Sequence, residues 1–312
     1  MLYKTYKSIF IEELSFLYDL GEAESFFYII LEKLHNLKRI DLALNPNLTL
    51  NDVDLEKLKA MVTELKTHKP IQYILGETQF YDLSFLVNEH TLIPRPETEE
   101  LVDFIISDVK NLEFKTKKLQ LLDIGTGSGC IAVSLAKNIE NSQVFAIDVS
   151  ENALEIATKN ATINEVEVTF IIQDILKISG LKEITNHNSQ PETRNSKPKT
   201  RITQPETRNL KFDIIVSNPP YVRNLEKLEI KENVLKYEPH LALFVADDDA
   251  LLFYRKIAQL AKEHLSENGK LYFEVNQYLG LETVQLLKDM GFKDVILKQD
   301  IYGNDRMVRG TF

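Results

Sequence analysis

The chain has 312 residues, 44% hydrophobic and 27% charged, as expected for a globular protein of about two domains. Its formal net charge of -10 opposes attraction to nucleic acid phosphates, and no apolar run is long enough to predict a membrane span. The N-terminus lacks the apolar core of a signal peptide, and Cys130 is the single cysteine. We therefore expect a cytoplasmic protein with neither nucleic acid nor a membrane as a direct partner.

Residues 1–75 are predicted to form a small helical domain. Apolar residues recur at helical spacing in two successive segments of it. A further helix is expected between residues 51 and 70, where Asp52 or Asp54 is the candidate N-cap and Pro70 would end the helix. No strand pattern interrupts this region.

Residues 76–95 change to a strand-like pattern. Short apolar runs next to Gly76 and Asn88 predict a hairpin that connects two domains. Pro96 suits the first position of the next helix, where an amide would have no intrahelical partner. Strand and helix patterns then alternate through residues 96–312. This alternation predicts an α/β domain with a mainly parallel, seven-stranded sheet and helices on both faces.

One polar segment, at about residues 185–209, does not follow the alternation. It contains the sequence QPETRN twice and almost no large apolar residues. Such a composition predicts a disordered insertion between two strands. Its basic residues leave a docking tail open as the alternative.

A glycine-rich turn, in the sequence LLDIGTGSGC, joins a predicted strand to a helix. Glycine permits positive φ and close backbone approach, and a helix N-terminus attracts a carboxylate or a phosphate. A dinucleotide-binding GxGxxG motif would need glycine where Cys130 stands. The GxGxG spacing instead resembles the first motif of class I methyltransferases. The candidate cofactor contacts in it are Gly125, Thr126, Gly127, Ser128 and Gly129.

Two acidic residues at later strand ends extend this candidate cofactor site. Asp148 closes the next strand, where a carboxylate can accept hydrogen bonds from both ribose hydroxyls. A helix-capping role for Asp148 is the weaker alternative, because Ser150 is better placed to cap. Asp174 ends the third strand and could bind an adenine amino group, with Ile175 packing on the ring. An ordinary strand-end role for Asp174 is an equal alternative.

The sequence SNPPY follows another predicted strand and is the candidate catalytic loop. Consecutive prolines make the loop rigid and leave it with carbonyl acceptors. An amide or aromatic amine nitrogen is a poor nucleophile, because its lone pair is delocalised. Acceptors for its two hydrogens, Asn218 Oδ1 and the Pro219 carbonyl, could orient the lone pair and stabilise the developing charge. Tyr221 could pack against the substrate plane and stabilise a cationic methyl group.

These motifs together resemble the release factor glutamine methyltransferases of the PrmC/HemK type. The resemblance extends to TLIPRPETEELV, to YEPHLALF and to DIYGNDRMVRG near the C-terminus. It implies a Rossmann-like methyltransferase domain that uses S-adenosylmethionine to methylate the glutamine amide of the GGQ motif in peptide chain release factors. The helical N-terminal domain would help to hold the release factor.

The resemblance also assigns residues to roles. Residues 125–129, Asp148, Ile175 and Asn218 would contact the cofactor. The glutamine would contact Asn218, Pro219, Pro220 and Tyr221. One departure from the family pattern is Asn276, which stands where the family usually has glycine.

Three other functions share part of this evidence. A glutamine methyltransferase of a ribosomal protein would need the same site. An adenine-N6 DNA methyltransferase also uses NPPY, but the acidic chain and the lack of an added basic domain count against it. A non-catalytic binding module would be expected to have eroded motifs, whereas GTGSG, Asp148 and NPPY are intact. The scattered histidines predict no metal site.

Overall fold

The computed structural model describes residues 1–110, 118–180 and 211–312, so the predicted insertion at 185–209 lies outside the described residues. Contacts divide the chain into two compact units, and two segments make up each of them. The first unit contains Met1–Glu77 and Lys231–Tyr237, and the second contains Thr78–Ile230 and Glu238–Phe312. Within the described ranges, none of the helices combines the length and the apolar character that crossing a bilayer requires.

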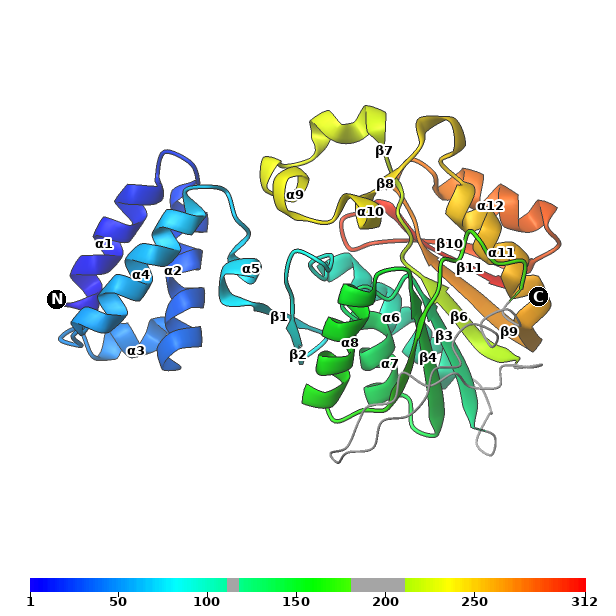
Figure 1. Ribbon diagram of the computed structural model, residues 1–312, viewed down its shortest axis with the longest axis horizontal. Helices are drawn as coiled ribbons and strands as arrows, with labels where there is room; N and C mark the ends of the chain where they lie inside the picture. Colours follow the sequence, from blue (N-terminus) through cyan, green and yellow to red (C-terminus); the bar gives the residue numbers. More distant parts are fainter. Residues whose placement is uncertain (111–117, 181–210) are drawn as a thin grey trace, which may run out of the picture. The chain divides into compact units, whose positions relative to one another are not determined.

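The helices within Met1–Glu77 of the first unit pack around an apolar core (Figure 1, blue to cyan). The rings of Phe10 and Phe27 meet edge to face at its centre, with their centroids 5.5 Å apart. The helical character predicted for this part of the chain is confirmed. Its helices are α1 (Tyr3–Leu14), α2 (Leu20–His35), α3 (Arg39–Leu44), α4 (Asp52–Leu65) and α5 (Ile71–Leu75), with α9 (Glu232–Tyr237) from later in the chain.

Helix α4 begins and ends differently from the sequence prediction. Its N-cap is Asn51, whose side chain accepts a hydrogen bond from the amide of Asp54 at 2.8 Å. The predicted caps, Asp52 and Asp54, lie inside the first turn, where their negative charge is favourable near the helix N-terminus. The helix ends at Leu65, and Pro70 instead precedes α5.

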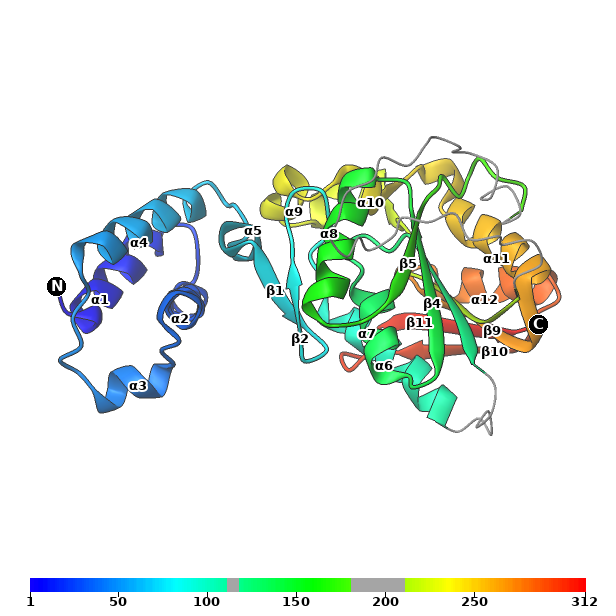
Figure 2. The ribbon, with the colours of Figure 1, turned by 60° about the horizontal axis from the view of Figure 1, so that its bottom comes forward.

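The second unit is built on a seven-stranded sheet with the strand order β10-β11-β9-β6-β3-β4-β5 (Figures 1 and 2). Strand β11 runs antiparallel to both neighbours, and the pairs from β9 to β5 are parallel. The predicted mainly parallel, seven-stranded sheet is therefore confirmed. Its strands are β3 (Leu119–Ile124), β4 (Ser142–Asp148), β5 (Val168–Ile172), β6 (Phe212–Ser217), β9 (Leu265–Glu274), β10 (Lys293–Gln299) and β11 (Asp305–Thr311).

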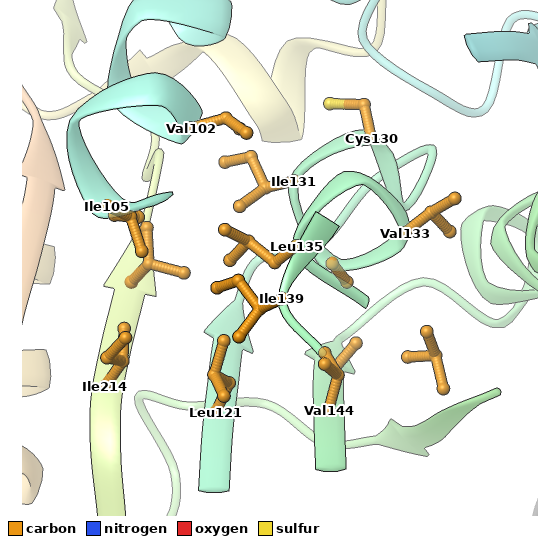
Figure 3. Close-up of a cluster of buried hydrophobic side chains, with 14 of the residues drawn as sticks. Val102, Ile105, Leu121, Cys130, Ile131, Val133, Leu135, Ile139, Val144 and Ile214 are labelled. Atoms are coloured by element: carbon orange, nitrogen blue, oxygen red, sulfur yellow. The ribbon is translucent and has the colours of Figure 1, made fainter. Parts of the chain in front are cut away.

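Helices cover both faces of this sheet, because alternate residues of each strand point to opposite sides. On β3, Leu121 belongs to one buried cluster and Leu122 to the other. Figure 3 shows part of the first cluster, in which Ile139 lies next to Leu121 and Leu135 lies on the other side of Ile139. The helices of the first face are α6 (Pro96–Lys110), α7 (Cys130–Asn138) and α8 (Glu151–Ile163), and those of the second are α11 (Leu252–His264) and α12 (Gly280–Asp289).

A hairpin precedes the sheet, as the sequence predicts, and a buried asparagine fixes it. The Asn160 side chain exchanges hydrogen bonds with the backbone of Leu86 at 2.7 and 3.0 Å, and it donates to the Ser128 carbonyl at 2.9 Å. One side chain of α8 therefore holds both the hairpin and the glycine loop. The hairpin strands are β1 (Glu77–Phe80) and β2 (Leu83–Leu86).

Several short elements between residues 222 and 249 had no counterpart in the sequence prediction. Strands β7 and β8 pair in parallel and connect the segment after SNPPY to the segment before α11. The short elements are β7 (Val222–Arg223), η2 (Asn224–Glu229), α10 (His240–Leu243), β8 (Phe244–Val245) and η3 (Asp247–Asp249).

Candidate active site

A cavity of about 310 Å³ lies at the carboxyl ends of β3, β4, β5 and β6. The strand order explains this position, because β4 and β5 extend the sheet on one side of β3 and β6 lies on its other side. Open parallel sheets bind ligands at such a topological switch point, where successive connections leave a central strand in opposite directions. The predicted cofactor residues line the cavity with the exception of Gly129, and so do Asn218, Pro219 and Pro220, whereas Tyr221 does not.

The glycine loop requires glycine for two different reasons. Gly127 has a φ of 55°, and a Cβ atom there would meet nothing within 4 Å, so only the backbone conformation demands glycine. At Gly129, where φ is 81°, a Cβ atom would also lie 3.0 Å from the Cβ of Ala157. Glycine therefore lets α7 begin close to α8, and Gly129 is the N-cap of α7.

Asp148, the last residue of β4, holds this loop through its carboxylate. Its Oδ2 accepts from the amide of Gly127 at 2.8 Å, and its Oδ1 accepts from the amide of Ser150 at 2.9 Å. The Ser150 side chain in turn accepts from Ala153, so Ser150 caps α8 as expected. Burial raises the pKa of Asp148. Each carboxylate oxygen can accept further bonds, so Asp148 can still bind a diol in the cavity.

Asp174 and Ile175 follow β5 and complete the far wall of the cavity. Asp174 accepts from the amide of Leu176 at 3.0 Å and forms an ion pair with Lys177 at 2.9 Å. The hydrogen bond from Lys177 lowers the pKa of Asp174. These bonds are those of an ordinary turn residue, although Asp174 also lines the cavity.

Asp123 is a buried acid at the site to which the sequence analysis gave no role. It precedes the glycine loop on β3, it is 1% exposed, and its Oδ2 accepts from the Thr126 hydroxyl at 2.7 Å. Burial, with a smaller contribution from Asp148, raises the pKa of Asp123 to about 7. An acidic residue inside an otherwise apolar strand is the signal that could have revealed it.

The SNPPY loop forms hydrogen bonds with side chains of other elements. Asn218 Nδ2 donates to the Thr98 hydroxyl at 3.3 Å, which leaves Asn218 Oδ1 as the available acceptor. The Tyr221 hydroxyl donates to Glu274 at 3.1 Å, and burial raises the pKa of Tyr221, so the phenol remains protonated. Any contribution of Tyr221 to substrate binding has to come from its ring.

Two segments far apart in sequence form one wall of the cavity. Arg95 Nη2 donates to Oε1 of Glu238 at 2.5 Å, and the amide of Ile93 donates to Oε2 of Glu238 at 3.2 Å. The Glu238 side chain is 1% exposed, so this ion pair is shielded from water on one side. Ile93, Arg95 and Pro239 all line the cavity.

Asn276, the departure from the family pattern, connects two loops beside the site. Its Nδ2 donates to the carbonyl of Tyr221 at 3.1 Å and to Oε2 of Glu226 at 3.0 Å. Glu226 also accepts from Arg223 and is buried. Glycine at position 276 could make neither side-chain bond, so Asn276 has a structural role in this chain.

The strand order and the motifs at the strand ends define a class I methyltransferase. The chain matches a family model described as a methyltransferase domain over residues 115–289, and another described as the PrmC N-terminal domain over residues 15–76. The same fold is found in the hMettl16 catalytic domain, solved in complex with a MAT2A 3'UTR hairpin. That structure has a TM-score of 0.50 and 15% identity, and the match covers 86% of this chain and 84% of that one.

Sequence relatives identify the family more closely. The chain is 57% identical to the release factor glutamine methyltransferase of Flavobacterium psychrophilum over 100% of both proteins. It is 38% identical to the release factor glutamine methyltransferase of Bacteroides thetaiotaomicron over 95% of each chain. The chain therefore belongs to the release factor glutamine methyltransferase family.

The contacts of Asn276 predict a stability effect. Asn276→Ala should lower the free energy of unfolding by about 1–3 kcal/mol, because it leaves buried acceptors of Tyr221 and Glu226 without this donor. Urea denaturation measures the change, with Gln277→Ala as the control at the neighbouring position. Equal stability of the Asn276 and Gln277 variants would contradict this role.

The raised pKa of Asp123 predicts a pH dependence of stability. Between pH 3.8, which is the ordinary pKa of an aspartate side chain, and about pH 7, Asp123 keeps its proton in the folded protein but releases it in the unfolded chain. Stability should therefore fall as pH rises through this window, by at most about 1.4 kcal/mol per pH unit. Asp123→Asn removes this contribution. Urea denaturation between about pH 5 and about pH 8 should show wild type losing stability relative to the variant as pH rises, and a constant difference between the two proteins would refute the prediction.

Proposed function

We propose that this chain transfers a methyl group from S-adenosylmethionine to the side-chain amide nitrogen of glutamine in the GGQ motif of peptide chain release factors. The observation that carries the proposal is the position of Asn218. Its Nδ2 is bound to Thr98, so its Oδ1 is the acceptor available at a cavity that Asp148 and the glycine loop also line. Membership of the family supports the choice of substrate.

The residues around the cavity fit the parts of S-adenosylmethionine. The start of α7 suits the methionine carboxylate, because a helix N-terminus presents free amides and a positive dipole end. Asp148 suits the ribose hydroxyls, and Ile175 with Asp174 suits the adenine. Gly125 and Gly127 leave open space where a Cβ atom would stand, so a ligand can approach the backbone closely. When bound, S-adenosylmethionine would supply an electrophilic methyl group on a sulfonium. The S–CH3 bond would break, S-adenosylhomocysteine would be the leaving group, and the amide proton lost on methylation would pass to solvent.

The chain's own contribution to the reaction is to orient the glutamine amide. Asn218 Oδ1 and the Pro219 carbonyl accept its two N–H hydrogens, which directs the nitrogen lone pair towards the methyl group. Both acceptors also stabilise the positive charge that develops on nitrogen. Neither is a strong base, so the rate enhancement comes from positioning and electrostatics. The Pro219–Pro220 pair keeps the loop rigid while the substrate binds.

The first unit has a surface suited to binding a protein substrate. Phe16, in the connection between α1 and α2, is 91% exposed, and Leu20, the first residue of α2, is 66% exposed. Large apolar side chains that face water in this way favour protein contacts. We assign this unit to holding the release factor, and we place the enzyme in the cytoplasm, where translation termination takes place.

A direct assay tests the proposed function. The purified protein is incubated with a release factor and S-adenosylmethionine, and the GGQ peptide is analysed by mass spectrometry. One added methyl group on this peptide is the expected result. A release factor with glutamate in place of the target glutamine should not be methylated, because a carboxylate has no NH2 to donate. Methylation of a ribosomal protein or of adenine in DNA, with the release factor unmodified, would overturn the proposal.

The acceptor role of Asn218 predicts a kinetic effect. Asn218→Ala should lower turnover by about a hundred- to a thousandfold, as expected for the loss of one preorganised polar contact. Cofactor affinity should change less, because the main role of this side chain is to hold the substrate NH2. Steady-state kinetics measure the effect, with Asn138→Ala as the control. Turnover similar to that of the control would remove Asn218 from the mechanism.

The bonds of Asp148 predict an effect on cofactor binding. Asp148→Ala should weaken S-adenosylmethionine binding by about ten- to a hundredfold, because a charge-assisted hydrogen bond to the ribose is lost. Titration calorimetry measures the affinity, and the exposed Glu151→Ala variant provides the control. Unchanged affinity in a folded Asp148 variant would show that this carboxylate does not bind the cofactor.

A further inference from the structure

A buried carboxylate, that of Glu274, lies beneath the SNPPY loop. Glu274 is the last residue of β9, which pairs with β6. Ser217, the last residue of β6, pairs with Phe273. The SNPPY loop therefore leaves β6 beside Glu274. Glu274 is 1% exposed and Thr98, from the first turn of α6, is 2% exposed.

Each oxygen of this carboxylate accepts a hydrogen bond from a different hydroxyl. Thr98 donates to Oε2 at 2.6 Å, and Tyr221 donates to Oε1 at 3.1 Å. The Thr98 oxygen also accepts a hydrogen bond from Asn218 Nδ2 at 3.3 Å. A single carboxylate is thus connected to two residues of SNPPY, directly to Tyr221 and through one hydroxyl to Asn218.

The number of protons on the Thr98 hydroxyl determines which way the Asn218 amide faces. A threonine hydroxyl has one hydrogen, and here that hydrogen is directed at Glu274. The Thr98 oxygen consequently presents lone pairs to Asn218, and only the NH2 group of the amide can face them favourably. A flipped amide would place Oδ1 against another acceptor and turn the NH2 group towards the substrate.

Two neighbouring groups stabilise Glu274 as an acceptor against the effect of its burial. Burial raises the pKa of Glu274, and the Thr98 hydroxyl and the positive charge of Arg306 oppose that rise. Arg306 is held by Asp300 at 3.2 Å. The backbone of Glu274 is fixed as well, because its carbonyl accepts from the Tyr254 hydroxyl at 3.3 Å.

We propose that Glu274 and Thr98 are positioning residues, which fix the Asn218 amide with its oxygen towards the substrate and hold Tyr221 through the same carboxylate. The inference rests on the proposed function, because it gives Asn218 Oδ1 its task as an acceptor. Neither residue touches the reacting atoms in this scheme. Their effect on the reaction is exerted through Asn218 and Tyr221.

A pair of substitutions at Thr98 separates the hydroxyl from the packing. Thr98→Val keeps the shape but removes the hydroxyl, and kcat should fall by about ten- to a hundredfold, as expected for a misoriented catalytic group. Thr98→Ser keeps the hydroxyl and should retain most of the activity. In both variants, KM and cofactor affinity should change little. Thr158→Val, a change of the same type on α8, is the matched control.

Glu274→Gln provides an independent test. The glutamine NH2 would donate to Thr98, whose hydroxyl hydrogen would then turn towards Asn218 and favour the flipped amide. We expect a loss of kcat similar to that of Thr98→Val. The double variant should be no slower than the slower single variant, because both changes act on the same amide.

A spectroscopic readout tests the inference without the reaction. The side-chain amide signals of Asn218, in ¹⁵N-asparagine-labelled protein, should shift and exchange faster with water in Thr98→Val than in Thr98→Ser. Three results would each overturn the inference. They are amide signals in Thr98→Val that match the wild type, equal kcat of the valine and serine variants, and kcat losses that only parallel losses of thermal stability. An unmethylated release factor with the wild-type enzyme would instead refute the proposed function.

Discussion

The position of β6 on the opposite side of β3 from β4 and β5 is the constraint on which the site depends. It brings the carboxyl ends of strands from both directions of the sheet to one crevice. The glycine loop, Asp148, Asp174 and Asn218 each lie at the carboxyl end of a different strand, and all of them line the cavity. Residues proposed to bind the cofactor and residues proposed to bind the substrate therefore line one cavity.

Buried polar side chains convert this coarse placement into a defined geometry. Asp148 holds the glycine loop, Asn160 holds the loop and the hairpin, and Glu274 lies under SNPPY. A buried polar group without a partner costs free energy, so such groups keep their few partners in place. The loops at the cavity are consequently ordered by hydrogen bonds to the elements beneath them, as electrostatic catalysis requires.

The parts of the fold that follow from local patterns could be predicted from the sequence. Strand and helix alternation is local, and so are the glycine spacing and the proline pair in SNPPY. The contacts that hold the site were missed because they join distant segments: Thr98 to Glu274, Ile93 and Arg95 to Glu238, and Asn160 to Leu86. Sequence patterns indicate which residues belong to a motif, but they do not show which buried partner lies beneath it.

The N-cap of α4 illustrates a different limit. The predicted caps were Asp52 and Asp54, whereas the observed cap is Asn51, and capping propensity alone does not distinguish these three side chains. The helix starts at Asp52 because Asn51 can reach the amide of Asp54. Asn276 is a similar case, since its sequence position marked it as unusual but only its contacts with Tyr221 and Glu226 explain it.

The position of the transferred methyl group tests the central claim most directly. Tandem mass spectrometry of the modified GGQ peptide, followed by acid hydrolysis, distinguishes a methyl group on the glutamine amide nitrogen from one elsewhere. The account predicts a methylated glutamine side chain that releases methylamine on hydrolysis, because both acceptors of the SNPPY loop face an NH2 group. A methyl group on a main-chain nitrogen or on an oxygen atom, with no methylamine released, would contradict it.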